Sequence, residues 1–252
     1  MSGRLLFLGY DRDTTRLYDV IEADGWAVEH RSSPVDDLTT YDLVVSFGYR
    51  QKISSEVLAG ASRPVLNLHM SYLPFNRGAH PNFWSFYDGT PAGISIHELD
   101  DTIDGGPVCF QKLVNFDNEE QTFATTYDRL FAELEELFCV HAEALLSGEY
   151  EARPQRGKGT SHCAADLPGE MTDWHVDIQQ TLAKIDQSYG DRHKRDMELV
   201  DEIQAVRTRN NVNWMDLLRI ALTHAPDEAK AVLRKINSDD RTISELFKEL
   251  GK

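Results

Sequence analysis

The chain has 252 residues, of which 41% are hydrophobic and 27% charged, and its formal net charge is −16. This composition is typical of a globular protein that buries a full core without disulfides, and the acidic charge argues against a nucleic-acid partner. Three widely spaced cysteines form no CxxC pair, which argues against a zinc site and favours a reducing, cytoplasmic compartment, and no apolar run is long enough for a signal peptide or a membrane span.

Short apolar runs alternate with helical segments from residue 4 to about residue 115. Strands are predicted at 4–10, 26–32, 41–49, 63–69, 92–100 and 107–116, and helices at 14–25, 54–60 and 81–89. A Thr start and a Gly stop delimit the helix at 14–25, and the strand at 92–100 alternates as one near a sheet edge does. This order predicts an α/β fold with a mostly parallel sheet and helices on both faces.

The second half of the chain is predicted to be largely helical. A helix at 121–150 has an apolar stripe made of Phe123, Tyr127, Leu130, Leu134, Leu137, Val140 and Leu145. From about Trp174 the pattern is helical to the end, with a new helix starting at Asn213 and a break at Ala225-Pro226. These features divide the chain into a domain at 1–150, an extended connector at 151–170 and a small helical C-terminal module at 171–252.

Polar residues gather where the strand at 63–69 ends, in "NLHMSYLPFNRGAH". Asn67 and His69 are two apart, so in a strand they point to the same side, and ligands of open parallel sheets bind beyond the carboxyl ends of the strands. Asp104 follows the strand at 92–100 and precedes a Gly-Gly pair that permits a tight turn.

An amide, an imidazole and a carboxylate together suit acyl-type transfer. The amide stabilises a developing oxyanion, the imidazole takes a proton from an amine, and the carboxylate holds the imidazole. No GxSxG nucleophile elbow is present, so direct transfer without a covalent enzyme intermediate is expected, and no GxGxxG follows the first strand. The alternatives are that these residues only cap turns, or that other groups take their place: Asp100 or Asp101 for the carboxylate, His80 or His97 for the imidazole.

The segments "NLHMSYLPFNRGAHP" and "HELDDTIDGGPV" together resemble the formyltransferase family that uses N10-formyltetrahydrofolate. The family pattern has an Asn-x-His, a Ser-x-Leu-Pro loop, an Arg-Gly and a His seven residues before an Asp-x-Gly, which here are Asn67, His69, residues 71–74, Arg77-Gly78, His97 and Asp104. The resemblance covers roughly residues 3–150. It implies a Rossmann-like sheet without a nucleotide-binding glycine loop, with the catalytic domain at 1–150.

The resemblance also implies roles for the site residues. Asn67 would polarise the formyl oxygen, His69 would assist the attack of the amine, and Asp104 would orient His69 and relay protons through water. The pteridine of N10-formyltetrahydrofolate, the co-substrate, would lie against Phe47, Gly48, Tyr49, Arg50, Gln51, Lys52 and Ile53, and against Ser71, Tyr72, Leu73 and Pro74.

The acceptor amine is expected to be on a nucleotide-linked amino-deoxysugar, such as a 4-amino-4,6-dideoxy sugar, for surface-glycan or nonulosonic-acid synthesis. The loop "YLPFNRGAHPNFWSF" and the connector "GKGTSHCAADLP" are similar to the sugar branch of the family, and from Leu167 onward 16 acidic residues outnumber 13 basic ones, which disfavours a tRNA acceptor. Core packing is the alternative role for Phe83 and Trp84. The expected substrate contacts are Arg77, His80, Asn82 and Trp84.

Other functions remain open on this pattern. They are formyl transfer to glycinamide ribonucleotide, hydrolysis of the formyl donor, and a non-enzymatic folate or nucleotide sensor. The complete set of Asn67, His69 and Asp104 argues against the sensor, which would not need all three residues. A homodimer is expected from the apolar positions of the tail helices. No metal, membrane or nucleic-acid partner is expected.

Overall fold

The computed structural model describes residues 3–116 and 121–235, so the helix expected over 236–252 lies outside the described residues. Two compact units make up the chain, Met1–Asp186 and Gln187–Lys252. The sequence pattern instead places the start of the helical module at 171. Residues up to 186 belong with the first unit because Met171, Ile178 and Ile185 are buried in one apolar cluster with Phe83 and Phe123.

A six-stranded sheet in the order β2-β1-β3-β4-β6-β7 forms the centre of the first unit. Its strands are β1 (Arg4–Gly9), β2 (Ala27–Arg31), β3 (Leu43–Phe47), β4 (Leu66–His69), β6 (Gly93–Glu98) and β7 (Val108–Leu113). The first four strands in this order are parallel, and β6 runs antiparallel to both of its neighbours. The predicted mostly parallel α/β sheet is therefore confirmed.

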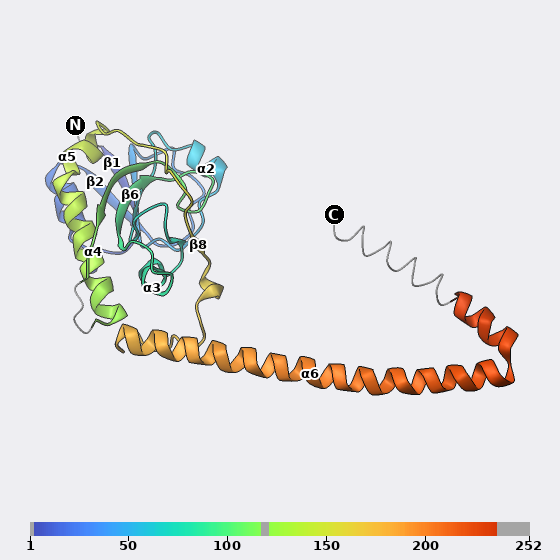
Figure 1. Ribbon diagram of the computed structural model, residues 1–252. Helices are drawn as coiled ribbons and strands as arrows, with labels where there is room; N and C mark the ends of the chain where they lie inside the picture. The colour runs from blue at the N-terminus through green and yellow to red at the C-terminus, as the bar shows by residue number, and fades with distance from the viewer. Residues whose placement is uncertain (1–2, 117–120, 236–252) are drawn as a thin grey trace. The chain divides into compact units, whose positions relative to one another are not determined.

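Helices cover both faces of the sheet, as predicted (Figure 1). In β1, Leu5 and Phe7 face one apolar cluster while Leu6 and Leu8 face another, which explains why the whole run "LLFL" is apolar. Helices α1 (Leu17–Ala23), α4 (Phe123–Val140) and α5 (Ala142–Ser147) pack on the first face, and α2 (Ser55–Ala59) packs on the second.

Two details of this unit differ from what the sequence pattern suggests. The strand β6 lies next to the edge strand β7, as its alternation predicts, but its alternating polar residues Ser95 and His97 are fully buried instead of facing solvent. Helix α1 begins at Leu17 with Arg16, not a Thr, as its N-cap, and the Thr15 hydroxyl before it donates to Glu135 and accepts from the Leu17 N–H at 3.4 Å.

The helix predicted over 121–150 is broken at His141 into α4 and α5. The His141 ring stacks on Phe110 with centroids 3.8 Å apart, and its backbone leaves the helical conformation. Val140, predicted on the buried stripe, is 67% exposed, whereas Phe138 is fully buried. The break lets Leu145 return to the core.

The connector is more structured than an extended linker. Its strand β8 (Ser161–His162) pairs in parallel with β5 (Arg77–Gly78), which precedes helix α3 (Pro81–Tyr87), and a short 3₁₀ helix, η1 (Ala164–Asp166), follows β8. The connector therefore packs against the loop that follows β4.

Helix α6 (Ile178–His224) is continuous, so the helix start expected at Asn213 is wrong. An Asn inside a helix lowers the stability of the helix by only about 0.7 kcal/mol relative to Ala. It caps a helix only where its own backbone is extended. The break at Ala225-Pro226 is confirmed, since α6 ends at His224 and helix resumes over 226–235. Within the described residues no helix is long and apolar enough to cross a membrane.

Candidate active site

The antiparallel register of β4 and β6 brings the polar side chains together. Asn67 lies opposite His97, and His69 lies opposite Ser95, so all four point to the same face of the sheet. The alternating residues Leu66 and Leu68 point to the other face, into the core beneath α4. The prediction that Asn67 and His69 share one side is confirmed.

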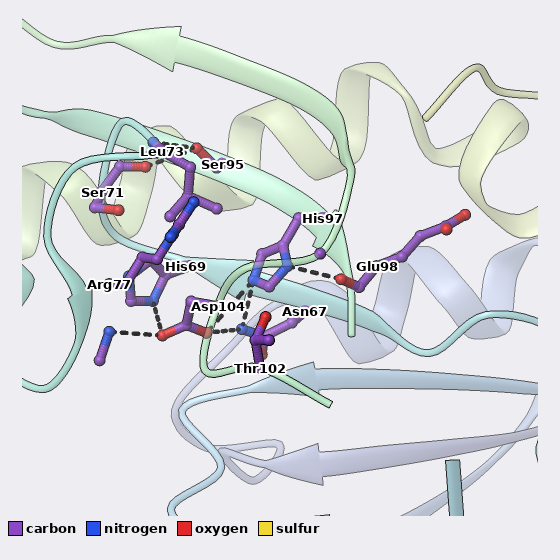
Figure 2. A network of polar contacts seen from close by, with 12 residues as sticks. Asn67, His69, Ser71, Leu73, Arg77, Ser95, His97, Glu98, Thr102 and Asp104 are labelled. Carbon is purple, nitrogen blue, oxygen red and sulfur yellow. Dashed lines mark hydrogen bonds and ion pairs between the residues drawn. The ribbon is translucent and has the colours of Figure 1, made fainter. Parts of the chain in front are cut away.

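The Asp104 carboxylate lies between three of these side chains (Figure 2). Its Oδ1 accepts a hydrogen bond from Asn67 Nδ2 at 3.2 Å and lies 3.5 Å from His97 Nε2, while its Oδ2 lies 3.7 Å from His69 Nδ1. Oδ2 also accepts a hydrogen bond from the Gly78 backbone N–H at 2.8 Å. The structure thus assembles the three predicted catalytic residues.

The loop after β6 aims this carboxylate. Asp104 has φ 47°, in the left-handed region, where Asp is tolerated better than most residues. A Cβ at Gly106 would lie 2.0 Å from the carbonyl oxygen of Glu98, so only glycine fits there. Asp100, a competing carboxylate in the sequence, accepts hydrogen bonds from the Thr102 N–H and hydroxyl and so holds the preceding turn.

Electrostatics keep Asp104 ionised. Burial acts to raise the pKa of its carboxyl, but the positive charge of the facing His69 and His97 in their imidazolium forms, together with the Gly78 N–H, outweighs burial. The pKa of Asp104 therefore lies well below its ordinary value. The site therefore favours a carboxylate anion beside two imidazoles.

The Asn76 carbonyl fixes the tautomer of His69. His69 Nε2 lies 3.0 Å from the Asn76 carbonyl oxygen, and because a carbonyl only accepts, Nε2 carries the proton of this bond. Nδ1 is then the free ring nitrogen, and its 3.7 Å separation from Asp104 is too long for a direct hydrogen bond. His69 is thus held by Asn76, with the Asp104 charge close enough to stabilise its imidazolium.

His97 is the fourth member of the site. Its Nδ1 donates to the Glu98 carbonyl oxygen at 2.9 Å, so Nε2 accepts from Asn67 Nδ2 at 3.0 Å. The two hydrogens of the Asn67 amide are thereby used by His97 and Asp104. To donate to a formyl oxygen, Asn67 has to exchange one of these partners.

The loop after β4 is held over this network by its own polar contacts. The Ser95 hydroxyl donates to the Ser71 carbonyl oxygen at 2.7 Å and accepts from the Leu73 N–H at 3.2 Å. The buried Ser71 hydroxyl has no hydrogen-bond partner in the described part of the chain. Asn76 is fully buried, and its backbone N–H and side-chain oxygen both bond to the Thr160 hydroxyl in the connector.

The other predicted folate-binding segment, 47–53, follows β3, the strand next to β4, so it lies at the same end of the sheet. Phe47 and Ile53 are buried, Gly48 lies against the Tyr10 ring, and the Tyr49 hydroxyl donates to the Ser33 carbonyl oxygen. Three of its side chains are exposed: Arg50, Gln51 and Lys52. In the 71–74 loop, Ser71 and Leu73 are buried, while Tyr72 and Pro74 are half-buried.

The four predicted substrate contacts have internal partners. The Arg77 guanidinium donates to Gln155, the His80 ring stacks on Trp174, and the buried Asn82 donates to the Phe123 carbonyl oxygen. Trp84 is buried and stacks on His162 with centroids 3.8 Å apart. Burial, and then the charge of Arg50, lowers the pKa of His80. Their contact with a substrate stays a prediction.

Sequence reasoning missed Asn76, Ser95 and Gln155, which hold the site from outside the Asn-x-His and Asp-x-Gly segments. The signal for Ser95 was present, because a Ser opposite His69 on an interior strand needs a polar partner. Asn76 and Gln155 lie in irregular segments without a periodic pattern. Within 3–116 and 121–235, no group of three or more His, Cys, Asp or Glu side chains is arranged so that it could hold a metal ion.

A mostly parallel sheet with an amide, two imidazoles and a carboxylate at one strand end defines a site suited to proton transfer at an attacked carbonyl group. The sequence profile described as "Formyl transferase" matches residues 28–142. A solved relative at 32% identity is covered along its whole length, and the chain belongs to the formyl transferase family.

That relative is the formyltransferase PseJ from Anoxybacillus kamchatkensis, in complex with UDP-4,6-dideoxy-4-formamido-L-AltNAc and tetrahydrofolate. The match covers 73% of this chain and 100% of that one, with a TM-score of 0.67. A 4-N formyltransferase from Francisella tularensis, at 18% identity and a TM-score of 0.62, shows the same fold over 71% of this chain and 86% of its own.

Among curated proteins, the chain is 32% identical over 127 residues to a dTDP-4-amino-4,6-dideoxyglucose formyltransferase from Mycobacterium tuberculosis. The match covers 50% of this chain and 53% of that protein. The chain therefore spans about half the length of the curated relatives that it matches.

Proposed function

We propose that this protein transfers a formyl group from N10-formyltetrahydrofolate to the amine of a nucleotide-linked amino-deoxysugar, by direct attack and without a covalent enzyme intermediate. The observation that carries the proposal is the arrangement around Asp104. An amide, an imidazole with a free Nδ1 and an ionised carboxylate converge at the end of β4, in a chain of the formyl transferase family.

The residues present fit the co-substrate, which supplies the formyl carbon. The buried Ser71 hydroxyl lacks a partner in the described residues, so it has donor and acceptor capacity for the amide-like edge of a pteridine. The backbone of 71–74 is held in place by Ser95 and by Gln111, whose amide donates to the Leu73 carbonyl oxygen. Leu73 and Ile53 supply apolar surface.

The chain's own residues handle the proton and the charge. As the amine nitrogen bonds to the formyl carbon, His69 Nδ1 takes the amine proton, and Asp104 stabilises the resulting imidazolium. An Asn67 N–H stabilises the negative charge that develops on the formyl oxygen. The bond from the formyl carbon to the donor nitrogen then breaks, and the proton held by His69 goes to that nitrogen.

The acceptor class follows from two lines of support. The chain is similar over 73% of its length to a formyltransferase whose structure contains a UDP-linked 4-formamido sugar. Acidic residues outnumber basic ones in the tail, which disfavours a tRNA acceptor. The proposal places the product in surface-glycan or nonulosonic-acid synthesis. It places the reaction in the cytoplasm, because three cysteines without a disulfide are typical of a reducing compartment.

The test is to incubate the purified protein with N10-formyltetrahydrofolate and a panel of nucleotide-linked 3-amino- and 4-amino-deoxysugars. We expect one acceptor to gain the mass of CO in step with the release of tetrahydrofolate. Release of tetrahydrofolate without a formylated sugar would support hydrolysis of the donor instead. Formylation of glycinamide ribonucleotide alone would also overturn the proposed acceptor.

His69→Ala tests the site itself. We expect its kcat to fall roughly 100-fold or more, while tetrahydrofolate binding measured by calorimetry is largely kept. His175→Ala is the matched control, because His175 is exposed and lies outside the site. Equal activity of His69→Ala and His175→Ala would contradict the proposed proton transfer.

A further inference from the structure

We propose that Gln155, in the connector, is a positioning residue that holds Asp104 in its catalytic orientation. The kinetic part of this inference depends on the proposed formyl transfer, whereas its structural part does not. Gln155 does not touch the Asp104 carboxylate and acts only through the backbone that carries it.

The Gln155 amide uses all of its hydrogen-bonding capacity. Its Nε2 donates to the Asp104 and Gly106 carbonyl oxygens, each at 2.8 Å. Its Oε1 accepts from Arg77 Nε at 3.0 Å and from Arg77 Nη2 at 2.7 Å. The reverse orientation would face an oxygen to two carbonyls and an NH₂ group to a guanidinium, so only one orientation is stable.

These bonds hold a segment that would otherwise have several conformations available. Asp104 has an unfavourable φ of 47° and precedes two glycines, which restrict the backbone least. Gln155 fixes the carbonyls on both sides of Gly105, and with them the direction in which the Asp104 side chain leaves the backbone. The Gly78 N–H then meets the carboxylate at 2.8 Å.

Arg77 completes the connection between the two loops. Its backbone continues into Gly78, which bonds to the Asp104 carboxylate, and its guanidinium bonds to Gln155, which bonds to the Asp104 carbonyl. Asp104 is therefore held at its side chain by Gly78 and at its backbone by Gln155, which is itself held by Arg77, the neighbour of Gly78. The predicted contact of Arg77 with the substrate would compete with this role.

The backbone of Gln155 is itself anchored on each side. Arg153 and Val108 exchange two backbone hydrogen bonds, at 2.8 and 2.9 Å. After Gln155, the Thr160 hydroxyl bonds to Asn76, whose carbonyl oxygen accepts a hydrogen bond from His69 Nε2. The connector is thus positioned well enough to act as a support for the site.

The kinetic test compares Gln155→Ala and Gln155→Glu with Arg153→Ala. Arg153 is a matched control because its side chain is 76% exposed and, among the residues that the structure describes, makes a surface ion pair with Glu151 and no other polar contact. We expect kcat of Gln155→Ala to fall roughly 10- to 100-fold, with KM for both substrates changed less than about threefold, because a misplaced catalytic group slows chemistry more than binding. Arg153→Ala should keep wild-type values.

Gln155→Glu tests the bonds donated by the Gln155 amide NH₂ group separately from those accepted by its oxygen. A carboxylate keeps both bonds from Arg77 but loses the two bonds donated to the Asp104 and Gly106 carbonyls, which would then face an anion. We expect kcat to fall at least as far as in Gln155→Ala. A wild-type kcat in Gln155→Glu would overturn the inference, because it would show that the bonds to the Asp104 loop are dispensable.

A second readout needs no activity. We expect the amide exchange rate of Gly78, measured by NMR, to rise about tenfold or more in Gln155→Ala and to stay unchanged in Arg153→Ala, because Asp104 no longer accepts its hydrogen bond. Suppose that the wild type formylated no acceptor, but that Gly78 exchanged faster in Gln155→Ala and at the wild-type rate in Arg153→Ala. The proposed function would then fail and the positioning role would stand. Unchanged exchange together with unchanged kcat would overturn the positioning role.

Discussion

Asp104 is the residue on which the candidate site depends most, since its two carboxylate oxygens face three side chains and one backbone N–H. The lowered pKa of Asp104 means that the native state favours the ionised form. Its ionisation therefore stabilises the fold above the unfolded pKa of about 3.9, and this contribution is lost as the pH falls through the native pKa.

Asp104→Asn should remove this pH dependence. We expect a loss of roughly 1–3 kcal/mol in the free energy of unfolding at pH 7, shrinking as the pH falls below about 4, where the unfolded wild type takes up a proton that the native carboxylate does not. Urea unfolding of both proteins between pH 3 and pH 7 measures this difference in the free energy of unfolding. Asp101→Asn, at an exposed position, serves as the control, and an equal loss for Asp104→Asn at both pH values would contradict a stabilising carboxylate.

The cysteines differ in reactivity for a similar reason. Burial, and then the charge of Glu98, raises the pKa of Cys109 to about 12, and burial raises the pKa of Cys139, whereas Cys163 is exposed. Because the thiolate is the reactive form, iodoacetamide at pH 8 should modify Cys163 first in the native protein. Peptide mass spectrometry identifies the site, and prior modification of Cys109 would show that its burial is wrong.

At the level of residues, the sequence was informative where a regular pattern carried the information. Strand alternation placed Asn67 and His69 on one side, and the spacing to Asp104 pointed to the carboxylate. It could not show that Asn76 rather than Asp104 bonds directly to His69, because that contact depends on the path of a loop. Nor could it show that Gln155 meets Asp104 from the connector.

At the level of elements, the small sheet of β5 and β8 connects the site to the connector. Gly78 has φ 88°, and a Cβ there would lie 2.3 Å from the His162 carbonyl oxygen. Any side chain at Gly78 would therefore push β8 away and weaken the bond from the Gly78 N–H to Asp104.

Gly78→Ala should destabilise the protein by more than its backbone conformation alone accounts for. Gly157 has the same φ of 88°, and a Cβ added there would have no atom within 4 Å, so Gly157→Ala measures the conformational cost alone, about 1–2 kcal/mol. We expect the melting temperature of Gly78→Ala to fall further than that of Gly157→Ala. Equal shifts would mean that β8 moves aside at no cost.

The regular elements were predictable because their apolar periods were long enough to recognise. The strands β1 to β4 and the helix α3 follow such apolar runs. The burial of both faces of β6 was not predictable, because its polar residues face a buried network instead of solvent. A two-residue strand such as β5 has no period at all. The break at His141 has no Gly or Pro to signal it.

At the level of the whole molecule, the first unit contains the complete candidate site and its own core. A chain ending at Asp186 should unfold in one cooperative transition, because it keeps Ile178 and Ile185, which are buried in an apolar cluster with Phe83 and Phe123. Thermal unfolding followed by circular dichroism tests this. A chain ending at 170, which lacks these residues, is the comparison that should be less stable.

The predicted homodimer is a property of the tail and is tested separately. In the second unit, Leu217 and Ile220 are 57% and 58% exposed, one turn apart on α6. We expect the full chain to have the mass of a dimer in light scattering, and the double substitution Leu217→Glu and Ile220→Glu to shift it to a monomer. A monomeric wild type would contradict the prediction.

The bonds between the connector and the loops after β4 and β6 also have a consequence for biosynthesis. Gln155 follows Asp104 by 51 residues, and Thr160 follows Asn76 by 84. During translation the N-terminal strands emerge first, but the Asp104 backbone lacks its bond from Gln155, and Asn76 its bonds to Thr160, until the segment through Thr160 has left the ribosome. A nascent chain arrested before that point would display the folded sheet without a finished active site.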